Sequence, residues 1–118
     1  MYSVYQFSLS REAADAVNDL GWGEAKKSYP EIAIHQDVLF DGGSDKFESW
    51  MGRHYKMVGQ FDVPTLNAVF HDGNVGERPA GMRSVSIGDI ILDERTGHAW
   101  MVDWDGFNMI NVFGLEAA

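Results

Sequence analysis

Apolar and polar residues alternate at the start of the chain, and this pattern predicts a strand over residues 2–9. Its two sides are Tyr2, Val4 and Gln6 on one face and Tyr5, Phe7 and Leu9 on the other. Over residues 11–20 the apolar positions recur at helical spacing, which predicts a helix. Ser10 is placed to cap this helix at its N-terminus, and Gly21 is placed to end it.

The middle of the chain has a mixed pattern. Residues 22–29 allow a further helical turn that stops at Pro30, and residues 32–40, apolar at both ends, predict a second strand. The glycine-rich residues 41–45 predict a loop, in which Ser44 is placed to cap a short helix. The residues that share one face of that helix are Phe47, Trp50 and Met51.

A strand and a second longer helix are expected next. Residues 56–61 predict the strand, and Pro64 stands where the helix begins. The apolar stripe of that helix is Leu66, Val69 and Phe70, and its expected end is Asp72-Gly73-Asn74. The irregular residues 73–83 are too few for a domain linker, so we expect residues 1–118 to form a single domain.

The C-terminal third has the clearest pattern. Its β-rich runs are residues 85–92, 99–104 and 107–113. Residues 93–97 predict one turn, and Asp105-Gly106 predicts a tight type I′ hairpin in which both turn residues need a positive φ. Gly88-Asp89 breaks the alternation and predicts a β-bulge. The expected fold is α+β, with two or three short helices packed on a mainly antiparallel sheet that ends in a three-stranded meander.

Composition narrows the classes of protein. Hydrophobic residues make up 45% of the 118, enough for a folded core, and there is no cysteine. Disulfide scaffolds, thiolate zinc sites and cysteine nucleophiles are thereby excluded. The first residues lack the pattern of a secretory signal, and no apolar run is long enough to span a membrane. We therefore expect a cytoplasmic protein.

Eighteen acidic residues oppose nine basic ones, which gives a net charge of −9. This sign disfavours direct binding to nucleic acid and to anionic membranes, because both depend on Lys and Arg. Two explanations stay open. The charge either keeps a small protein soluble or forms a negative face for a basic partner.

Candidate chemistry is sparse. Asp103, Asp105 and Gly106 resemble a fragment of a calcium loop whose other ligands are missing, so we expect no metal and no cofactor. His71-Asp72 is a candidate oriented base, but no nucleophile motif accompanies it. We assign no catalytic residue. An enzyme that uses His71, Asp72 or Asp103 in a cleft is kept as an alternative.

The last 35 residues carry six acids and one base. The acids are Asp89, Asp93, Glu94, Asp103, Asp105 and Glu116. Carboxylates two residues apart on a strand lie on one side, and such rows resemble the phosphates of nucleic acid. Trp100, Val102 and Trp104 also alternate along one strand, either as a core face or as a recognition surface. The predicted partner-binding residues are Asp89, Asp93, Glu94, Trp100, Asp103, Trp104 and Asp105.

Several short sequence segments occur in the same order as in a known family of domains. They are Tyr2-Ser3-Val4-Tyr5-Gln6, residues 55–58 and 66–70, Arg83-Ser84-Val85-Ser86-Ile87-Gly88-Asp89-Ile90-Ile91, and Trp100-Met101-Val102-Asp103 with Gly106-Phe107. Together they resemble YodL-type domains of phages, plasmids and conjugative elements. The resemblance is carried mainly by residues 83–107 and departs at residues 93–98 and at Trp104-Asp105. It implies an origin in a mobile element and a role against host defences, and it supplies no catalytic residue.

The function expected from these observations is that of a small acidic interaction protein. It would inhibit a nucleic-acid-binding defence complex of the host, in the manner of an anti-CRISPR or anti-restriction protein, by occupying a basic groove. Its partner would be a basic host protein or nucleoprotein complex. The alternatives are the small His/Asp enzyme above and a self-associating accessory module, for which a homodimer is expected.

Overall fold

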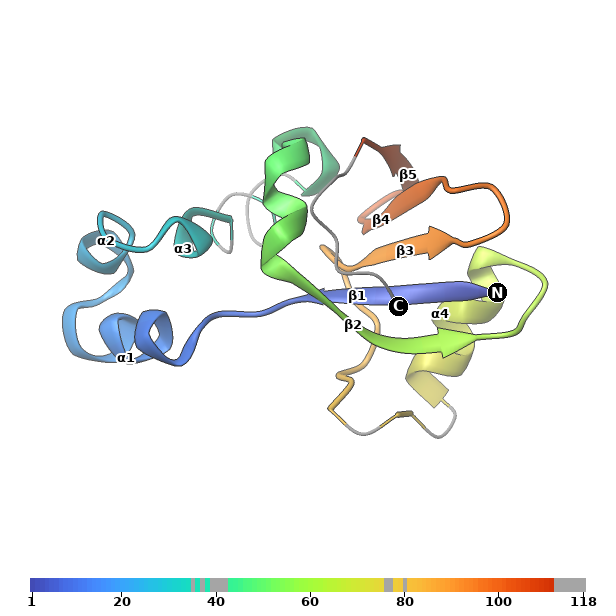
Figure 1. The fold of residues 1–118 in the computed structure, drawn as a ribbon, viewed down its shortest axis with the longest axis horizontal. Coiled ribbons are helices and arrows are strands. Elements are labelled where there is room, and N and C mark those ends of the chain that lie inside the picture. The colour runs from blue at the N-terminus through green and yellow to red at the C-terminus, as the bar shows by residue number, and fades with distance from the viewer. Residues whose placement is uncertain (35, 37, 39–42, 76–77, 80, 112–118) are drawn as a thin grey trace.

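A five-stranded antiparallel sheet forms the centre of the computed structural model, which describes residues 1–34, 36, 38, 43–75, 78–79 and 81–111 (Figure 1). The strands are β1 (Tyr2–Phe7), β2 (Tyr55–Phe61), β3 (Ile90–Asp93), β4 (Ala99–Asp103) and β5 (Gly106–Ile110). Their order is β2-β1-β3-β4-β5, and every neighbouring pair is antiparallel. The predicted α+β class and the C-terminal three-stranded meander are confirmed.

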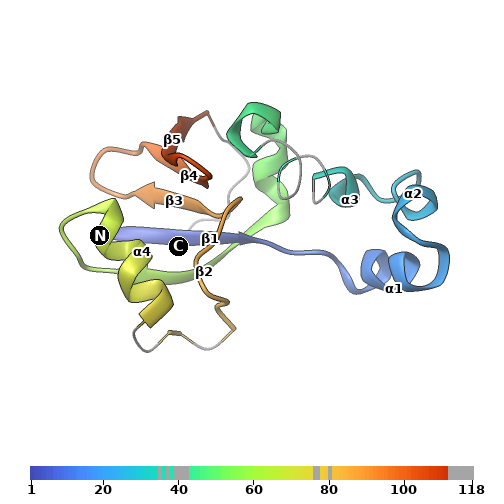
Figure 2. The same cartoon turned by 180° about the vertical axis from the view of Figure 1, so that it is seen from behind.

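The helical elements lie around and beyond this sheet. They are α1 (Arg11–Leu20), α2 (Trp22–Ala25), α3 (Pro30–Ile34), the 3-10 helices η2 (Gly43–Lys46) and η3 (Ser49–His54), and α4 (Leu66–Val75). Both ribbon views show α1, α2 and α3 as an arm that projects from one end of the sheet (Figures 1 and 2). The molecule is accordingly elongated, with extents of 44 × 27 × 26 Å.

Both faces of the sheet are covered. On one face, Met51 of η3 and Val38 pack against strand residues; that cluster is Tyr5, Phe7, Val38, Met51, Tyr55, Ile90, Ala99 and Met101. On the other face, Val69 of α4 packs with the segment that carries Met82 and Val85; that cluster is Tyr2, Val4, Val69, Met82, Val85, Ile91 and Val102. The alternation predicted for the first strand is therefore correct, and all six residues of β1 are buried.

The arm has a small core of its own, formed by Ala13, Ala25 and Ile32. Its first helix begins and ends as predicted. The Ser10 hydroxyl accepts a hydrogen bond from the Ala13 amide at 3.1 Å, and the Gly21 amide donates to the Val17 carbonyl at 2.9 Å. Local capping chemistry therefore sets where α1 begins and ends.

The strand predicted at residues 32–40 is wrong. Helix α3 begins at Pro30, and the described residues 36 and 38 beyond it are also outside any strand. Proline favours the first position of a helix because its missing N–H is not needed there, and Glu31 in the first turn is favourable for the helix dipole. Residues 35, 37, 39 and 40 lie outside the described residues.

The first predicted strand of the meander is shorter than expected, because β3 begins only at Ile90. The Asp89 amide instead donates to the Ser86 carbonyl at 3.1 Å, which closes a turn where we predicted a β-bulge. Val85, 2% exposed, belongs to the α4 side of the core. The register irregularity of the described sheet lies elsewhere, in β1 between Val4 and Tyr5.

The β4–β5 hairpin is confirmed, but its turn differs from the type I′ prediction. Asp103 pairs with Gly106, so the two turn residues are Trp104 and Asp105. No described residue other than glycine has a positive φ, whereas Gly106 has a φ of +123° as the first residue of β5. The Asp103 carboxylate accepts from the Trp104 amide at 3.0 Å, and this side-chain bond favours the observed turn.

Two smaller expectations need correction. Ser44 does not cap the helix that follows it, because its hydroxyl donates to Asp103 and η3 begins only at Ser49. Helix α4 does not end at Asp72-Gly73-Asn74 but continues to Val75. A Cβ on Gly73 would overlap the side chain of Val85, so the glycine at this position allows α4 to pack closely on the following segment.

Candidate functional site

The predicted partner-binding residues lie in three different environments, of which the first is the interior. Asp89 is 3% exposed. Its carboxylate accepts hydrogen bonds from the Gln6 side-chain amide and from the Ser86 backbone amide, both at 3.0 Å. Burial raises the pKa of Asp89 to about 6, although these hydrogen bonds and Arg83 act in the opposite direction. Asp89 therefore holds the turn before β3 and does not reach the surface.

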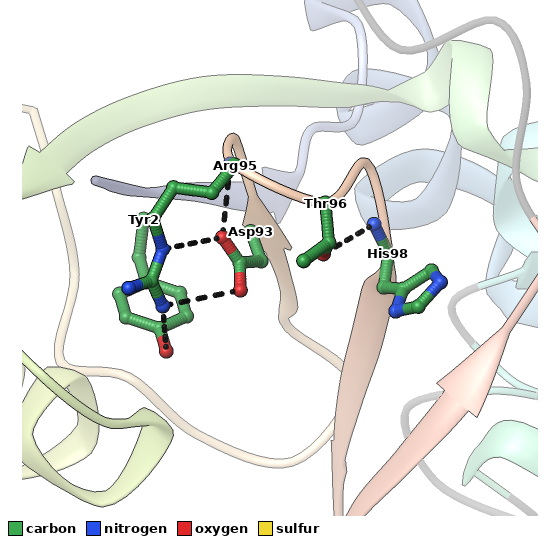
Figure 3. Close-up of polar contacts among 5 residues, drawn as sticks. All are labelled: Tyr2, Asp93, Arg95, Thr96 and His98. Carbon is green, nitrogen blue, oxygen red and sulfur yellow. Dashed lines mark hydrogen bonds and ion pairs between the residues drawn. The ribbon is translucent and has the colours of Figure 1, made fainter.

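Asp93 lies at the end of β3 and is paired with a cation (Figure 3). The Arg95 guanidinium donates to both carboxylate oxygens, at 3.3 and 3.4 Å, and the Arg95 amide donates at 3.0 Å. Hydrogen bonding from Arg95 holds the pKa of Asp93 below its ordinary value. The same guanidinium lies over the Tyr2 ring and donates to its hydroxyl at 3.2 Å. The negative charge of Asp93 is thus neutralised within the molecule.

Glu94 follows Asp93 and is exposed. One of its carboxylate oxygens accepts from the Ser3 hydroxyl at 2.6 Å, and Ser3 in turn accepts from Gln60 at 3.2 Å. Glu94 consequently presents a charge to solvent from a fixed position where β1 begins and β3 ends.

Asp103 joins two parts of the chain that are distant in sequence. One carboxylate oxygen accepts from the Ser44 amide at 3.0 Å, from the Ser44 hydroxyl at 2.6 Å and from the Asn108 side chain at 3.1 Å. Burial acts to raise the pKa of Asp103, but the hydrogen bonds from Ser44 and Trp104 hold it below its ordinary value. Asp103 is therefore an ionised anchor between η2 and the β4–β5 hairpin.

The turn of this hairpin presents an aromatic side chain to solvent. Trp104 is 83% exposed, the largest fraction among the exposed large hydrophobic residues of the described chain. The next residue, Asp105, is also exposed, and its carboxylate accepts from Asn108 at 3.1 Å. We call residues 103–106 the hairpin tip. Its backbone is held by the bond from the Trp104 amide to Asp103 and by the β4–β5 pairing, and the Asn108 side chain donates to the carboxylates of Asp103 and Asp105.

Trp100 lies farther along β4, half-buried and directly opposite Met109 of β5, which is 54% exposed. Phe107 shares this face of the sheet and meets Phe70 of α4 edge to face, with ring centroids 6.4 Å apart. We call these four residues the apolar patch. Trp100 therefore belongs to a partly covered face of the sheet and not to the hairpin tip.

A negative surface on the arm was not anticipated from the sequence. Glu12, Asp15 and Asp19 are all exposed, and their spacing of three and four residues places them on one side of α1. The stripe spans about 10 Å at 1.5 Å per residue. The spacing is present in the sequence, but it follows the period of a helix, whereas the carboxylate rows predicted above follow the period of a strand.

The enzyme alternative has little geometric support. His71 and Asp72 form a contact of 3.2 Å between Nδ1 and Oδ1, and their side chains are 70% and 47% exposed. Such exposure leaves the pair screened by water, in contrast to the enclosed base that acid–base catalysis needs.

Across the described part of the chain, no three His, Cys, Asp or Glu side chains gather as metal ligands. No helix among the described residues is long and apolar enough to cross a membrane.

Comparison with known proteins identifies no relative: no protein-family model, no curated protein and no solved structure matches this chain.

Proposed function

We propose that this chain is an interaction protein that binds a basic partner through its hairpin tip. The observation that carries the proposal is Trp104, an indole 83% exposed on a turn that internal hydrogen bonds hold in one conformation. Following the resemblance to YodL-type domains, we further propose that the partner belongs to a nucleic-acid-binding defence complex of a host cell, and that the chain acts for a phage or mobile element in the host cytoplasm.

Trp104 has the properties of a binding hot spot. Tryptophan is enriched at the centres of protein interfaces because it supplies a large contact area with few rotatable bonds. The Asp103 anchor fixes the turn before binding, so little conformational entropy is lost when a partner closes over the indole. Most of the favourable free energy of burying the indole in a partner's pocket therefore remains as binding free energy.

The surrounding charges favour a basic partner. Asp105 lies next to Trp104 and is exposed, whereas on η2, which Asp103 ties to the same hairpin, the exposed Asp45 is offset by the exposed Lys46. The chain as a whole carries −9, so its long-range field attracts a basic surface and repels an acidic one. Asp89 and Asp93 are left out of this surface because one is buried and the other is paired with Arg95.

The test begins with capture of host proteins by the tagged chain at low ionic strength, followed by measurement of Kd for the purified partner. Trp104→Ala is expected to weaken binding about 30-fold, the effect of losing about 2 kcal/mol at a hot spot. Leu20→Ala is the matched control, because Leu20 is also a large exposed hydrophobic residue but lies on the arm. Equal affinity of Trp104→Ala and the original chain would contradict the proposal.

A second measurement separates the hairpin tip from the acidic stripe of α1. The triple variant Glu12→Gln, Asp15→Asn and Asp19→Asn removes three exposed charges from the arm. We expect it to lower the association rate by a few-fold at low salt and to leave the dissociation rate unchanged. Raising the ionic strength from about 0.05 M to about 0.5 M should erase this difference. A triple variant that loses as much affinity as Trp104→Ala would place the main contact on the arm.

Self-association is a second candidate, favoured by the apolar patch. Its members lie on one side of the sheet, and Met109 is half-exposed on β5, the last strand of the sheet in the described part of the chain. Isologous contact of two such patches would form a dimer. Sedimentation equilibrium of the original chain and of the Met109→Lys variant tests this candidate. A dimer that dissociates in the lysine variant supports it, and an original chain that is monomeric at about 0.1 mM contradicts it.

A further inference from the structure

Two adjoining pockets lie at the base of the arm, on the β1–β2 side of the sheet. The first has a volume of about 180 Å³ and is lined by Ser8, Ser10, Glu31, Arg53, His54 and Lys56. The second, of about 240 Å³, shares Ser8 and Lys56 with the first and adds Gln6, Val58, Gly81 and Arg83 among others. We call the two together the basal groove. The Ser8 amide donates to the His54 carbonyl at 3.0 Å, which joins its two walls.

The basal groove concentrates positive charge on an acidic protein. Arg53, Lys56 and Arg83 supply three of the nine basic residues of the chain, and all three are exposed. The Arg83 guanidinium is held in place by a hydrogen bond of 3.1 Å to the Phe7 carbonyl. In a chain with twice as many acids as bases, three cations therefore line two adjoining pockets.

The acidic groups of the groove are satisfied by internal hydrogen bonds. Glu31 is buried and accepts from the Ser10 hydroxyl at 2.8 Å. Burial acts to raise the pKa of Glu31, but the Ser10 hydrogen bond and the neighbouring His54 hold it below its ordinary value. Asp89 lies behind Gln6 and accepts from it. Both carboxylates are therefore engaged inside the protein, and the exposed charged side chains of the groove are those of Arg53, Lys56 and Arg83.

His54 adds a polar group to the first pocket. Burial lowers the pKa of His54, and Arg53 acts in the same direction, while Glu31 opposes both. The imidazole is therefore neutral at neutral pH, and a neutral imidazole can donate one hydrogen bond and accept one. All six residues that line the first pocket are polar, whereas the second pocket also contains the apolar side chain of Val58.

We propose that the basal groove binds a small organic phosphate. The phosphate group lies in the first pocket between Arg53 and Lys56, because guanidinium and ammonium groups are the side chains that bind phosphate oxygens best. The organic part extends into the second pocket, over Val58 and towards Arg83. A long polyanion such as nucleic acid is excluded from the groove by the net charge of the chain, which repels distant phosphates. This inference goes beyond the proposed function and does not depend on it.

Titration of the labelled chain with three probes, followed by amide chemical shifts, tests the inference. The probes are inorganic phosphate, adenosine monophosphate and adenosine. We expect phosphate and the nucleotide to shift the amides of residues 8–10 and 53–58, the nucleotide to bind about 10-fold more tightly than phosphate, and adenosine to cause no shift. Absence of shifts with the nucleotide at about 10 mM would overturn the proposal. Equal affinity for phosphate and nucleotide would overturn the role of the second pocket.

Alanine variants of three exposed cations test whether binding depends on the residues of the basal groove. Lys56 lines both pockets, so Lys56→Ala is expected to weaken nucleotide binding about 10-fold or more. Arg53→Ala should weaken inorganic phosphate and nucleotide equally, since Arg53 lines only the first pocket. Lys46→Ala removes an exposed cation of η2 and should change neither affinity. Equal losses for Lys46→Ala and Lys56→Ala would show attraction of anions to any lysine and would overturn the site.

Discussion

Replacement of Asp89 by asparagine is expected to stabilise the protein at pH 7 by about 2–3 kcal/mol. The carboxyl group of Asp89 is 3% exposed, and burial raises its pKa from 3.8 to about 6. At pH 7 the folded protein must therefore hold an ionised carboxylate in a poorly solvated site. Asparagine has nearly the same shape and keeps an oxygen to accept from Gln6 and Ser86, but it carries no charge.

The pH dependence follows from the same difference in pKa. The folded state binds the proton of Asp89 more tightly than the unfolded state, so the stability that this group contributes is fully present below pH 3.8 and is lost as the pH rises through about 6. A separation of about 2 pKa units corresponds to about 3 kcal/mol. The advantage of Asp89→Asn over the original chain should therefore be largest at pH 7 and vanish near pH 3.5.

Urea unfolding at several pH values between 3.5 and 7.5 measures this advantage. Glu31, Asp93 and Asp103 have lowered pKa values and contribute with the opposite sign, but they are present in both chains and cancel in the difference. Asp105→Asn, which removes an exposed carboxylate, is the control and should give a difference near zero. An Asp89→Asn chain that is less stable than the original at pH 7 would show that attraction to Arg83 outweighs the burial of the charge.

The elements predicted correctly are those whose ends are marked by capping or turn residues close by in the sequence. Helix α1 has its capping serine and terminal glycine within one turn of its ends, and the meander has turn sequences between its strands. The strand predicted at residues 32–40 failed for a related reason. Its apolar positions are compatible with a strand or a helix, and the local preference of Pro30 for the first position of a helix decides between them.

The exposure of the acidic residues depends on contacts between distant parts of the chain. Strand β1 inserts between β2 and β3, and so brings Gln6 to Asp89 across 83 residues. Alternation along a strand indicates which residues share a face, but it does not show that the second face is covered as well. Here α4 and the segment that carries Met82 cover that face, so Asp89 is inside although the sequence pattern allowed it to be outside.

Gly43→Ala is expected to destabilise the protein by about 3 kcal/mol and to loosen the hairpin tip. Gly43 has a φ of +56°, a conformation that costs an alanine about 1 kcal/mol or more. Its Cβ would also overlap the Asp103 carboxylate, whose Cγ would lie only 2.7 Å away. To make room, Asp103 must give up one of its two hydrogen bonds from Ser44, and a charge-assisted bond of this kind contributes about 1.5–3 kcal/mol.

A double-mutant cycle with Asp103→Ala separates these two causes. Without the carboxylate the overlap disappears, so Gly43→Ala should then cost only the backbone strain of about 1 kcal/mol, and the coupling between the sites should be about 2 kcal/mol. Gly97→Ala is the matched control, because Gly97 has a φ of +78° with no atom near the added Cβ and should show no coupling to Asp103. The Gly43→Ala variant keeps the indole of Trp104. If this variant loses affinity for the partner, binding depends on the fixed conformation of the turn. If its affinity is unchanged while its stability falls, Asp103 contributes to the fold alone.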